Sequence, residues 1–362
     1  MRAQEIGKPP VVRSATAHHG GTLVVLAATL VMAMGRPASS RAGDSQSYQG
    51  SREPSEIEMK NTYLELPSHS PASRTIALTT VAMVAFAANS VLCRLAFTSA
   101  SIDPATFTFV RLSSGTVMLW IIWLVIKRGG QVRGSWSAAM ALFAYASAFS
   151  FAYISLPAGA GALLLFGAVQ ATMVMTGLVR GERQTSAQWF GFVLALVGLA
   201  ALLAPGVSAS PVMGAFLMLV AGVAWGAYSL LGRGVVDPLG ATAGNFIRTL
   251  PMAVDLCIVA VIFSAKPSVS GLIYAVLSGA VASGLGYTIW YAAIPGLTPT
   301  QGASVQLSVP VITALGGALV LGEGITVRLT ASSLVILGGI GLVIASKRRS
   351  RPRSTAFPHS LK

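Results

Sequence analysis

Charged residues almost disappear from the long central part of this chain. Of its 11 acidic residues, only five fall between Thr75 and Ser346, namely Asp103, Glu182, Asp237, Asp255 and Glu323. Over the whole chain 10% of residues are charged and 54% are hydrophobic, whereas a soluble domain carries about 25% charged residues. A water-soluble fold could not keep such a stretch in solution. The sequence therefore predicts an integral membrane protein.

Apolar runs of membrane-spanning length divide this central part. A helix needs roughly 20 apolar residues to cross a bilayer, and Gly, Pro and charge clusters separate runs of about that length. The predicted fold class is all-α, with ten transmembrane helices. The expected spans cover residues 75–93, 107–126, 136–154, 158–179, 188–204, 212–231, 242–264, 271–292, 300–321 and 329–346.

The central part also contains an internal repeat. The sequence LVRGE at 178–182 returns as LVLGE at 319–323, and FVR at 109–111 returns as FIR at 246–248. Five expected spans precede the link at 205–211 and five follow it, and an odd number forces the second half to insert upside down. Duplicated membrane units of this kind are typical of secondary transporters, whose repeats rock about a central site. The predicted organisation is an N-terminal extension, two inverted five-helix repeats and a basic tail, at residues 1–74, 75–204, 212–346 and 347–362.

Basic residues gather on one side of the expected spans, and such residues mark the cytoplasmic side. The links after the second and fourth spans are basic, and a cluster follows the last span, at residues 347, 348, 349, 351 and 353. All of these share one side if both termini are cytoplasmic, which we predict, in a plasma or bacterial inner membrane. The net charge of +14 is explained by this anchor on anionic headgroups and does not indicate a nucleic-acid partner.

The first 74 residues have several interpretations. A 13-residue apolar run at 22–34 follows Arg13 and resembles the hydrophobic part of a signal peptide, although it is short for a membrane span. Residues 35–74 are rich in Ser, Pro and charge, a composition that favours disorder. A translation start at Met59, a cleaved signal and an eleventh membrane segment all stay open.

Both halves carry an arginine early in their second span and a Gly-Glu pair between their fourth and fifth spans. In these features the chain resembles the EamA branch of the drug/metabolite transporter superfamily. In the second half, Ala224-Trp225-Gly226 followed by Arg233 is similar to the Trp-Gly opening of the family. The first half has Phe86-Ala87 in that place, with Asn89 and Arg94 at the expected positions. The resemblance implies a ten-span transporter of a small metabolite, amino acid-like or drug-like, commonly an exporter and sometimes an importer.

Ionisable groups inside the membrane are costly and are therefore candidates for function. Asp255 falls near the middle of the seventh span, four residues after Pro251, which loosens a helix. There it could bind substrate, or take up and release a proton during alternating access, which would make protons the coupling ion. The alternatives are a structural ion pair with Arg248, seven residues earlier on nearly the same face, and an interfacial position that would follow if the span is misplaced.

Arg111 and Arg248 are the basic pair related by the repeat. Each could hold a carboxylate or phosphate through two parallel hydrogen bonds, or could extend its side chain to the nearby membrane surface. Glu182 and Glu323, the acids of the repeated motif, each lie between two spans. We expect them to be structural, capping the following helix or pairing with a local arginine.

Neutral polar side chains complete the candidate cavity. Asn89, Gln170, Gln306 and Tyr228 fall within expected spans, where unpaired amides are costly, so each should face other helices. Contacts between helices are the alternative role for these four. Trp290 lies in an aromatic cluster that could form a gate or a belt at the lipid headgroups.

No motif of an enzyme or an ATP-driven pump occurs in the sequence. All four histidines lie in the tails, and Cys93 and Cys257 have no metal-binding spacing, so we expect neither cofactor nor metal. The expected partners are a small-molecule substrate, the lipid bilayer and protons. The oligomeric state stays open, a homodimer included. A channel or a non-transporting membrane scaffold is the alternative function.

Overall fold

A computed structural model describes most of the chain after residue 70. Every element within this part is helical, with no strand. The interpretations of the N-terminal extension, of Glu182 and of the tail after residue 349 fall outside it. The described residues are 71–127, 132–181, 183–204, 211–263, 266–297 and 299–349.

The helices follow the ten expected spans along the chain. The first half contains α2 (Pro71–Thr98), α3 (Pro104–Lys127), α4 (Trp136–Ala152), α5 (Ala158–Val179) and α6 (Ser186–Leu203). The second half contains α7 (Val212–Leu231), α8 (Pro238–Phe263), α9 (Val269–Val276), η1 (Leu277–Leu285), α10 (Gly286–Ala293), η2 (Ile294–Gly296), α11 (Pro299–Gln306), α12 (Ser308–Leu321) and α13 (Val327–Arg349).

Eight helical segments of the described chain are long and apolar enough to cross a membrane. The segment Trp136–Ala152 is apolar but shorter, and α8 is not among the eight. The all-helical membrane-type fold is thus confirmed, whereas the number of crossings stays a prediction.

Two helices of the second half are interrupted, and the sequence explains one of the interruptions. The break between α11 and α12 falls at Leu307, three residues before Pro310. Proline has no N–H to donate to the preceding turn, so an irregularity is expected there. Between α9 and α10 the chain forms the π-helix η1, whose sequence LSGAVASGL is rich in small residues. In contrast, α8 continues through Pro251.

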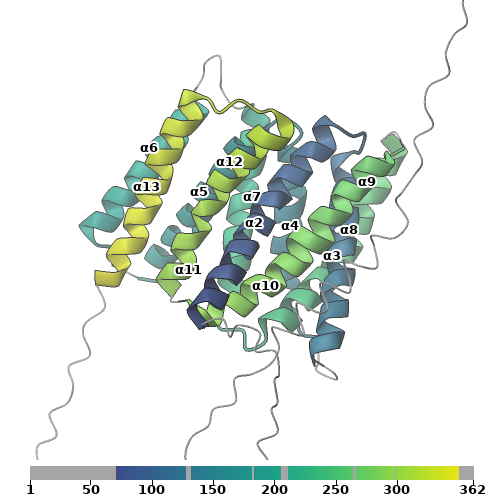
Figure 1. The fold of residues 1–362 in the computed structure, drawn as a ribbon, viewed down its shortest axis with the longest axis horizontal. Coiled ribbons are helices and arrows are strands. Elements are labelled where there is room, and N and C mark those ends of the chain that lie inside the picture. The colour runs from purple at the N-terminus through teal and green to yellow at the C-terminus, as the bar shows by residue number, and fades with distance from the viewer. Residues whose placement is uncertain are drawn as a thin grey trace, which may run out of the picture. The chain divides into compact units, whose positions relative to one another are not determined.

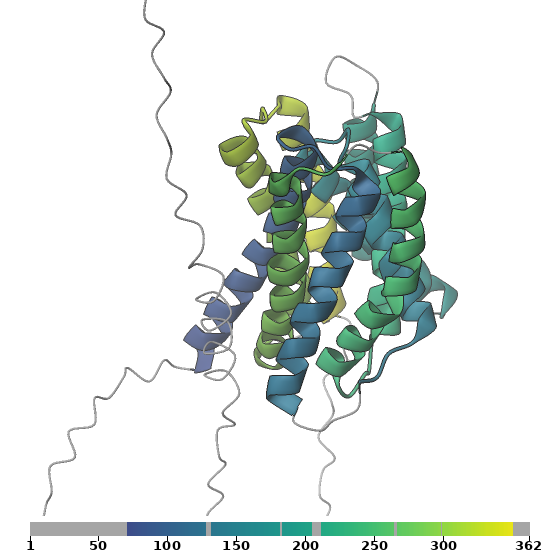
Figure 2. The same ribbon diagram turned by 90° about the vertical axis from the view of Figure 1, so that its right-hand side faces the viewer.

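The helices pack in a pattern that is unchanged when the two halves are exchanged. The corresponding helices α6 and α13 pack on each other, as do α3 and α8. The contact of α4 with α7 corresponds to the contact of η1 and α10 with α2. The contact of α5 with α7 corresponds to that of α12 with α2. Figures 1 and 2 show these helices side by side with their axes roughly aligned. This contact symmetry is what a repeat of two five-helix units requires.

The described chain starts and finishes at the same end of the bundle. In Figure 1 the dark purple start of α2 and the yellow end of α13 both lie at the lower end. At the opposite end α2 finishes near Arg94, and the connections α4–α5 and α12–α13 meet it there. We call this opposite end the Arg94 end.

Candidate functional site

A small polar cavity lies between the two halves of the bundle. It has a volume of about 40 Å³, enough for a few water molecules and too small for a metabolite. Helices α2, α4 and α5 of the first half and α7, η1, α10 and α11 of the second all contribute to its wall. Its lining residues are Phe86, Asn89, Ser90, Tyr145, Phe149, Leu165, Phe166, Trp225, Ala282, Ser283, Tyr287 and Gln306.

Arg111 is buried against this wall. Its side chain is 3% exposed, and its Nη2 donates a hydrogen bond of 3.1 Å to the Tyr145 hydroxyl. The guanidinium carbon lies 5.3 Å from the ring centre of Tyr145 and 4.8 Å from that of Phe149, which are cation–π distances. Nη1 is buried without a hydrogen-bond partner. The arginine therefore brings a positive charge to the cavity wall with part of its bonding capacity unused.

A chain of hydrogen bonds links Arg111 to the second half of the molecule. The Asn89 amide donates to the Tyr145 hydroxyl over 3.4 Å and accepts from the Ser278 hydroxyl at 2.6 Å. Ser278 belongs to η1, whose Gly279 lies so close to α3 that a Cβ there would be 2.0 Å from the Arg111 carbonyl oxygen. The absence of a side chain at Gly279 thus lets η1 approach Arg111.

Aromatic rings fill the space on the other side of the cavity. Trp225 lies at the centre of this group, with ring centres 4.8 Å from Tyr145, 5.6 Å from Tyr287 and 5.4 Å from Tyr228. Tyr287 stacks further on Tyr291 at 6.5 Å. The rings form a column that leads away from the Arg94 end.

Polar contacts near the start of α8 close the far side of this column. The Tyr291 and Thr242 hydroxyls are 2.8 Å apart, and the Asn245 amide donates to the Tyr228 hydroxyl over 3.5 Å. The same Asn245 accepts a hydrogen bond of 2.9 Å from the Ser135 backbone N–H in the other half. Asn245 therefore connects the two halves at the end opposite Arg94.

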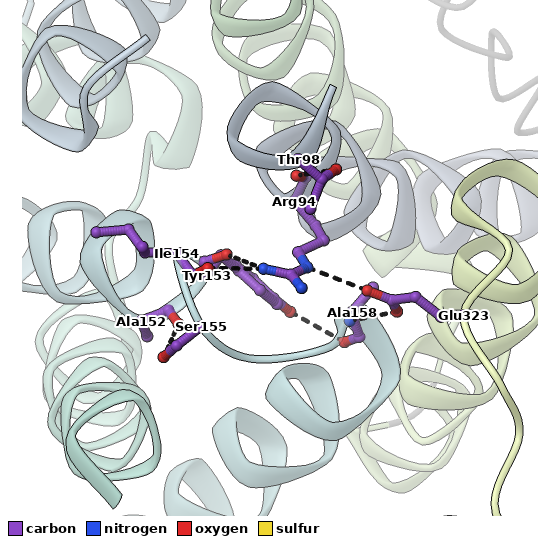
Figure 3. A network of polar contacts seen from close by, with 8 residues as sticks. All are labelled: Arg94, Thr98, Ala152, Tyr153, Ile154, Ser155, Ala158 and Glu323. Atoms are coloured by element: carbon purple, nitrogen blue, oxygen red, sulfur yellow. Dashed lines mark hydrogen bonds and ion pairs between the residues drawn. The ribbon is translucent and has the colours of Figure 1, made fainter. Parts of the chain in front are cut away.

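A second polar network joins the halves at the Arg94 end, as shown in Figure 3. Arg94 Nε lies 3.1 Å from Glu323 Oε1, and Arg94 Nη1 donates to the carbonyl oxygens of Tyr153 and Ile154 at 3.0 and 2.8 Å. Glu323 Oε2 accepts the backbone N–H of Ala158, the first residue of α5, at 2.7 Å. We call these five residues the Arg94–Glu323 latch.

The latch gives Glu323 partners that the sequence does not reveal. The sequence predicts that it caps the following helix or pairs with a local arginine, but it accepts the N–H of Ala158 at the start of α5 and contacts Arg94. Both partners belong to the other repeat, whereas the local residue Arg328 donates to the Ala204 carbonyl oxygen at 2.7 Å. Glu323 holds the α12–α13 connection against α2 and α5 and so joins the two repeats.

The other predicted site residues are divided between the cavity and its surroundings. Asn89 and Gln306 line the cavity. Tyr228 belongs to the aromatic column, and Trp290 contacts Phe86 with ring centres 6.3 Å apart. Gln170 lies instead in an apolar cleft of about 20 Å³ formed by α5, α6 and α13.

Asp255 and Arg248 lie apart from the cavity. Asp255 is exposed on α8, and no ion pair joins it to Arg248 in the described chain. Because α8 begins at Pro238, four residues before the predicted span, Asp255 lies about 26 Å along the helix rather than at its middle. Arg248 is half-buried and donates to the Gly244 carbonyl oxygen of its own helix at 3.0 Å.

Tyr145 is the central residue that the sequence reasoning missed. It contacts Asn89, Arg111 and Trp225, yet a single tyrosine in the alanine-rich α4 resembles ordinary packing. One signal was available, because Tyr145 and Phe149 are four residues apart and therefore share a helix face. Their rings lie 5.4 Å apart beneath the Arg111 guanidinium.

The fold and the site together define a helical membrane protein of the transporter type, built from two repeats around a polar cavity. The profile of the EamA-like transporter family matches residues 73–204 and 212–345, so the chain belongs to this family. The match covers both halves, as the duplicated motifs indicated.

Two relatives and one solved structure are similar to this chain. An uncharacterised protein of Pseudomonas aeruginosa is 54% identical over 278 residues, covering 76% of this chain and 96% of that protein. An uncharacterised transporter of Archaeoglobus fulgidus is 24% identical, covering 76% of this chain and 99% of its own. A protein solved by crystallography has the same fold, with a TM-score of 0.55 and 19% identity, over 77% of this chain and 99% of the other.

Proposed function

We propose that the protein is a secondary active transporter that moves a small metabolite across the cell membrane by alternating access. The observation that carries the proposal is a cavity between two symmetrically packed repeats with a polar closure on either side of it. Family membership supports the same class of activity. Rocking of one repeat against the other would open one closure at a time.

Specific contacts at each end of the bundle must break before the cavity can open there. At one end the Arg94–Glu323 latch must separate before the cavity opens there, because Glu323 joins the α12–α13 connection to α2 and α5. At the other end the hydrogen bond from the Ser135 backbone N–H to Asn245 must break, because it joins the two repeats there. Because the cavity holds only a few waters, we assign this arrangement to the state of the proposed cycle in which substrate cannot enter.

Export driven by protons is the direction and coupling that we propose, with a cell-membrane location and both termini in the cytoplasm. Asp255 is the carboxylate predicted for coupling, and it lies on α8 apart from the cavity. Asp255→Asn would then abolish the dependence of flux on a pH gradient while substrate exchange persists. Equal pH dependence in the variant and the parent would exclude this role.

Reconstitution of the purified protein into liposomes tests the function. Vesicles would receive labelled phenylalanine, benzoate, adenine or tetraphenylphosphonium, each over a range of concentrations. We expect saturable flux of at least one solute that protein-free vesicles lack. A channel would instead show flux proportional to concentration, and a scaffold would show none, so either result would overturn the proposal.

A further inference from the structure

An uncompensated positive charge lies beside the cavity. Arg111 is the eighth residue of α3, about 10 Å from the start of the helix, and it is 3% exposed. A guanidinium stays protonated in proteins, and a charge within the hydrocarbon region is costly. The ion pair found in the described part of the chain is Arg94–Glu323, so Arg111 has no carboxylate partner there.

The contacts of Arg111 stabilise the charge without neutralising it. The rings of Tyr145 and Phe149 attract the cation, and the Tyr145 hydroxyl accepts one of its five N–H donors. Nη1 retains its donors, because it is buried with no hydrogen-bond partner. Leaving such a group unpaired costs free energy that a ligand could recover.

Tyr145 supplies a second unused donor at the same place. A hydroxyl has two acceptor positions and one donor. The acceptor positions of Tyr145 are taken by Arg111 Nη2 and by the Asn89 amide, so its own proton is left to donate. A hydroxyl that accepts from a cation becomes a stronger donor. Arg111 and Tyr145 together therefore present two donors suited to an anionic acceptor.

The charge of Arg111 favours an anion over a cation at this wall. None of the residues that line the cavity is charged, so the charge of Arg111 dominates the local potential. Phe86, Trp225 and Tyr287 offer flat apolar surfaces along the same cavity. Arg248, the repeat counterpart of Arg111, bonds to its own helix and is not at the cavity.

From this arrangement we infer that the substrate is a small organic carboxylate, an amino acid included, whose carboxylate binds Arg111 and the Tyr145 hydroxyl. Its apolar part lies against the aromatic wall. The inference rests on the proposed transport function and specifies the substrate class of that site. It excludes the organic cations that a drug-like substrate could include, because a buried guanidinium repels them.

Three probes of nearly equal shape test the inference on the whole protein in detergent. Benzoate, benzamide and benzylamine carry a negative, a neutral and a positive group on the same ring. We expect benzoate alone to raise the thermal stability of the parent protein, because a ligand that binds the folded state stabilises it. Stabilisation by benzylamine or benzamide to the same degree as by benzoate would overturn the inference, as would no response to benzoate together with none to phenylalanine.

Substitutions then locate the binding group. Arg111→Gln and Tyr145→Phe should each raise the apparent Kd for benzoate, by about tenfold to a hundredfold for the arginine. Arg248→Gln is the matched control and should leave it unchanged. Tyr145→Phe keeps the ring, so it gives an answer even where Arg111→Gln fails to fold. Unchanged benzoate affinity in Tyr145→Phe, or an equal loss in Arg248→Gln, would contradict the assignment.

Failure of this inference is separable from failure of the proposed function. Saturable flux of adenine or tetraphenylphosphonium without any carboxylate binding would refute the substrate class and leave transport intact. Carboxylate binding without flux of any solute would refute transport and leave the anion site intact.

Discussion

Glu323 joins three elements through a single carboxylate. One oxygen meets Arg94 on α2 and the other accepts the first N–H of α5, while the residue itself follows α12. The two side chains are 17% and 19% exposed, so the contact is shielded from water and is worth more than a surface ion pair. A charge change at this residue should therefore alter the balance between closed and open states.

We expect Glu323→Gln to open the Arg94 end more often. The amide retains an acceptor for the α5 N–H but loses its charge toward Arg94, which weakens the contact by about 1–3 kcal/mol. A cysteine placed at the cavity residue Ser283, in a protein without Cys93 and Cys257, reports this change. It should react faster with a membrane-impermeant thiol reagent in Glu323→Gln.

Asp103→Asn is the matched control for this measurement. Asp103 also caps a helix start, through the Ala105 and Thr106 N–H groups, but its hydrogen bonds stay within its own repeat. Asn is an equally good cap. If labelling rises as much in Asp103→Asn as in Glu323→Gln, the latch has no specific role.

At the residue scale, the sequence predicts those polar groups that are rare in apolar runs. Arg111, Asn89 and Gln306 stand out on this basis, and the structure places all three in or against the cavity wall. The rule does not show that Asp255 lies apart from the cavity, because a position along a helix does not determine which face the residue occupies. It also misses Tyr145, whose importance depends on contacts with three other helices.

Close contact between helices depends on individual glycines. The repeat-related helices α6 and α13 cross where Gly191 and Gly339 meet, and a Cβ on Gly339 would be 2.5 Å from the Gly191 carbonyl oxygen. The neighbouring Gly338 has no atom within 4 Å of such a Cβ. Substitutions at these two adjacent glycines therefore distinguish the effect of close packing from the effect of helix propensity.

We expect Gly339→Ala to destabilise the protein and Gly338→Ala to leave its stability unchanged or slightly raised. The first substitution forces two backbones apart, at about 1–3 kcal/mol, whereas the second only restrains the unfolded chain. Thermal denaturation in detergent, followed by size-exclusion chromatography, measures both. Equal stability of the two variants would show that this crossing is not tightly packed.

The elements themselves are largely predictable because apolar length and Pro or Gly boundaries are local properties. The break between α11 and α12 lies near Pro310, which is also a local signal. The π-helix η1 was not predicted, since its geometry follows from the close approach of Gly279 to α3 rather than from any local motif. Interruptions of this kind are frequent at functional sites, and η1 lines the cavity with Ala282 and Ser283.

Over the whole molecule, the exchange symmetry of the contacts has a consequence for topology. If each repeat crosses the membrane five times, the link at 205–211 and the C-terminus lie on opposite sides. Alkaline phosphatase, which is active only outside the cytoplasm, should then be active when fused after Ala204 and inactive when fused after Arg349. Activity at both sites would contradict the inverted arrangement.

The two repeats differ in the surroundings of equivalent residues. The chain provides equivalent arginines at 111 and 248, yet only Arg111 lies against the cavity wall. In the proposed mechanism, symmetry lets the bundle alternate between two states, whereas the asymmetric residues select the substrate. Neither the internal duplication nor the family match identifies this asymmetry, which appears only when the helices are placed in space.

Reversible cross-linking of the latch during transport tests the central claim most directly. Arg94→Cys and Glu323→Cys would be combined in the protein without Cys93 and Cys257, reconstituted, and joined by a short cleavable thiol cross-linker. Alternating access predicts that flux of the transported solute falls to the background of empty vesicles when the two cysteines are linked and returns after reduction. The cross-linker should not change the flux through either single cysteine variant. Undiminished flux through the linked protein would contradict the account.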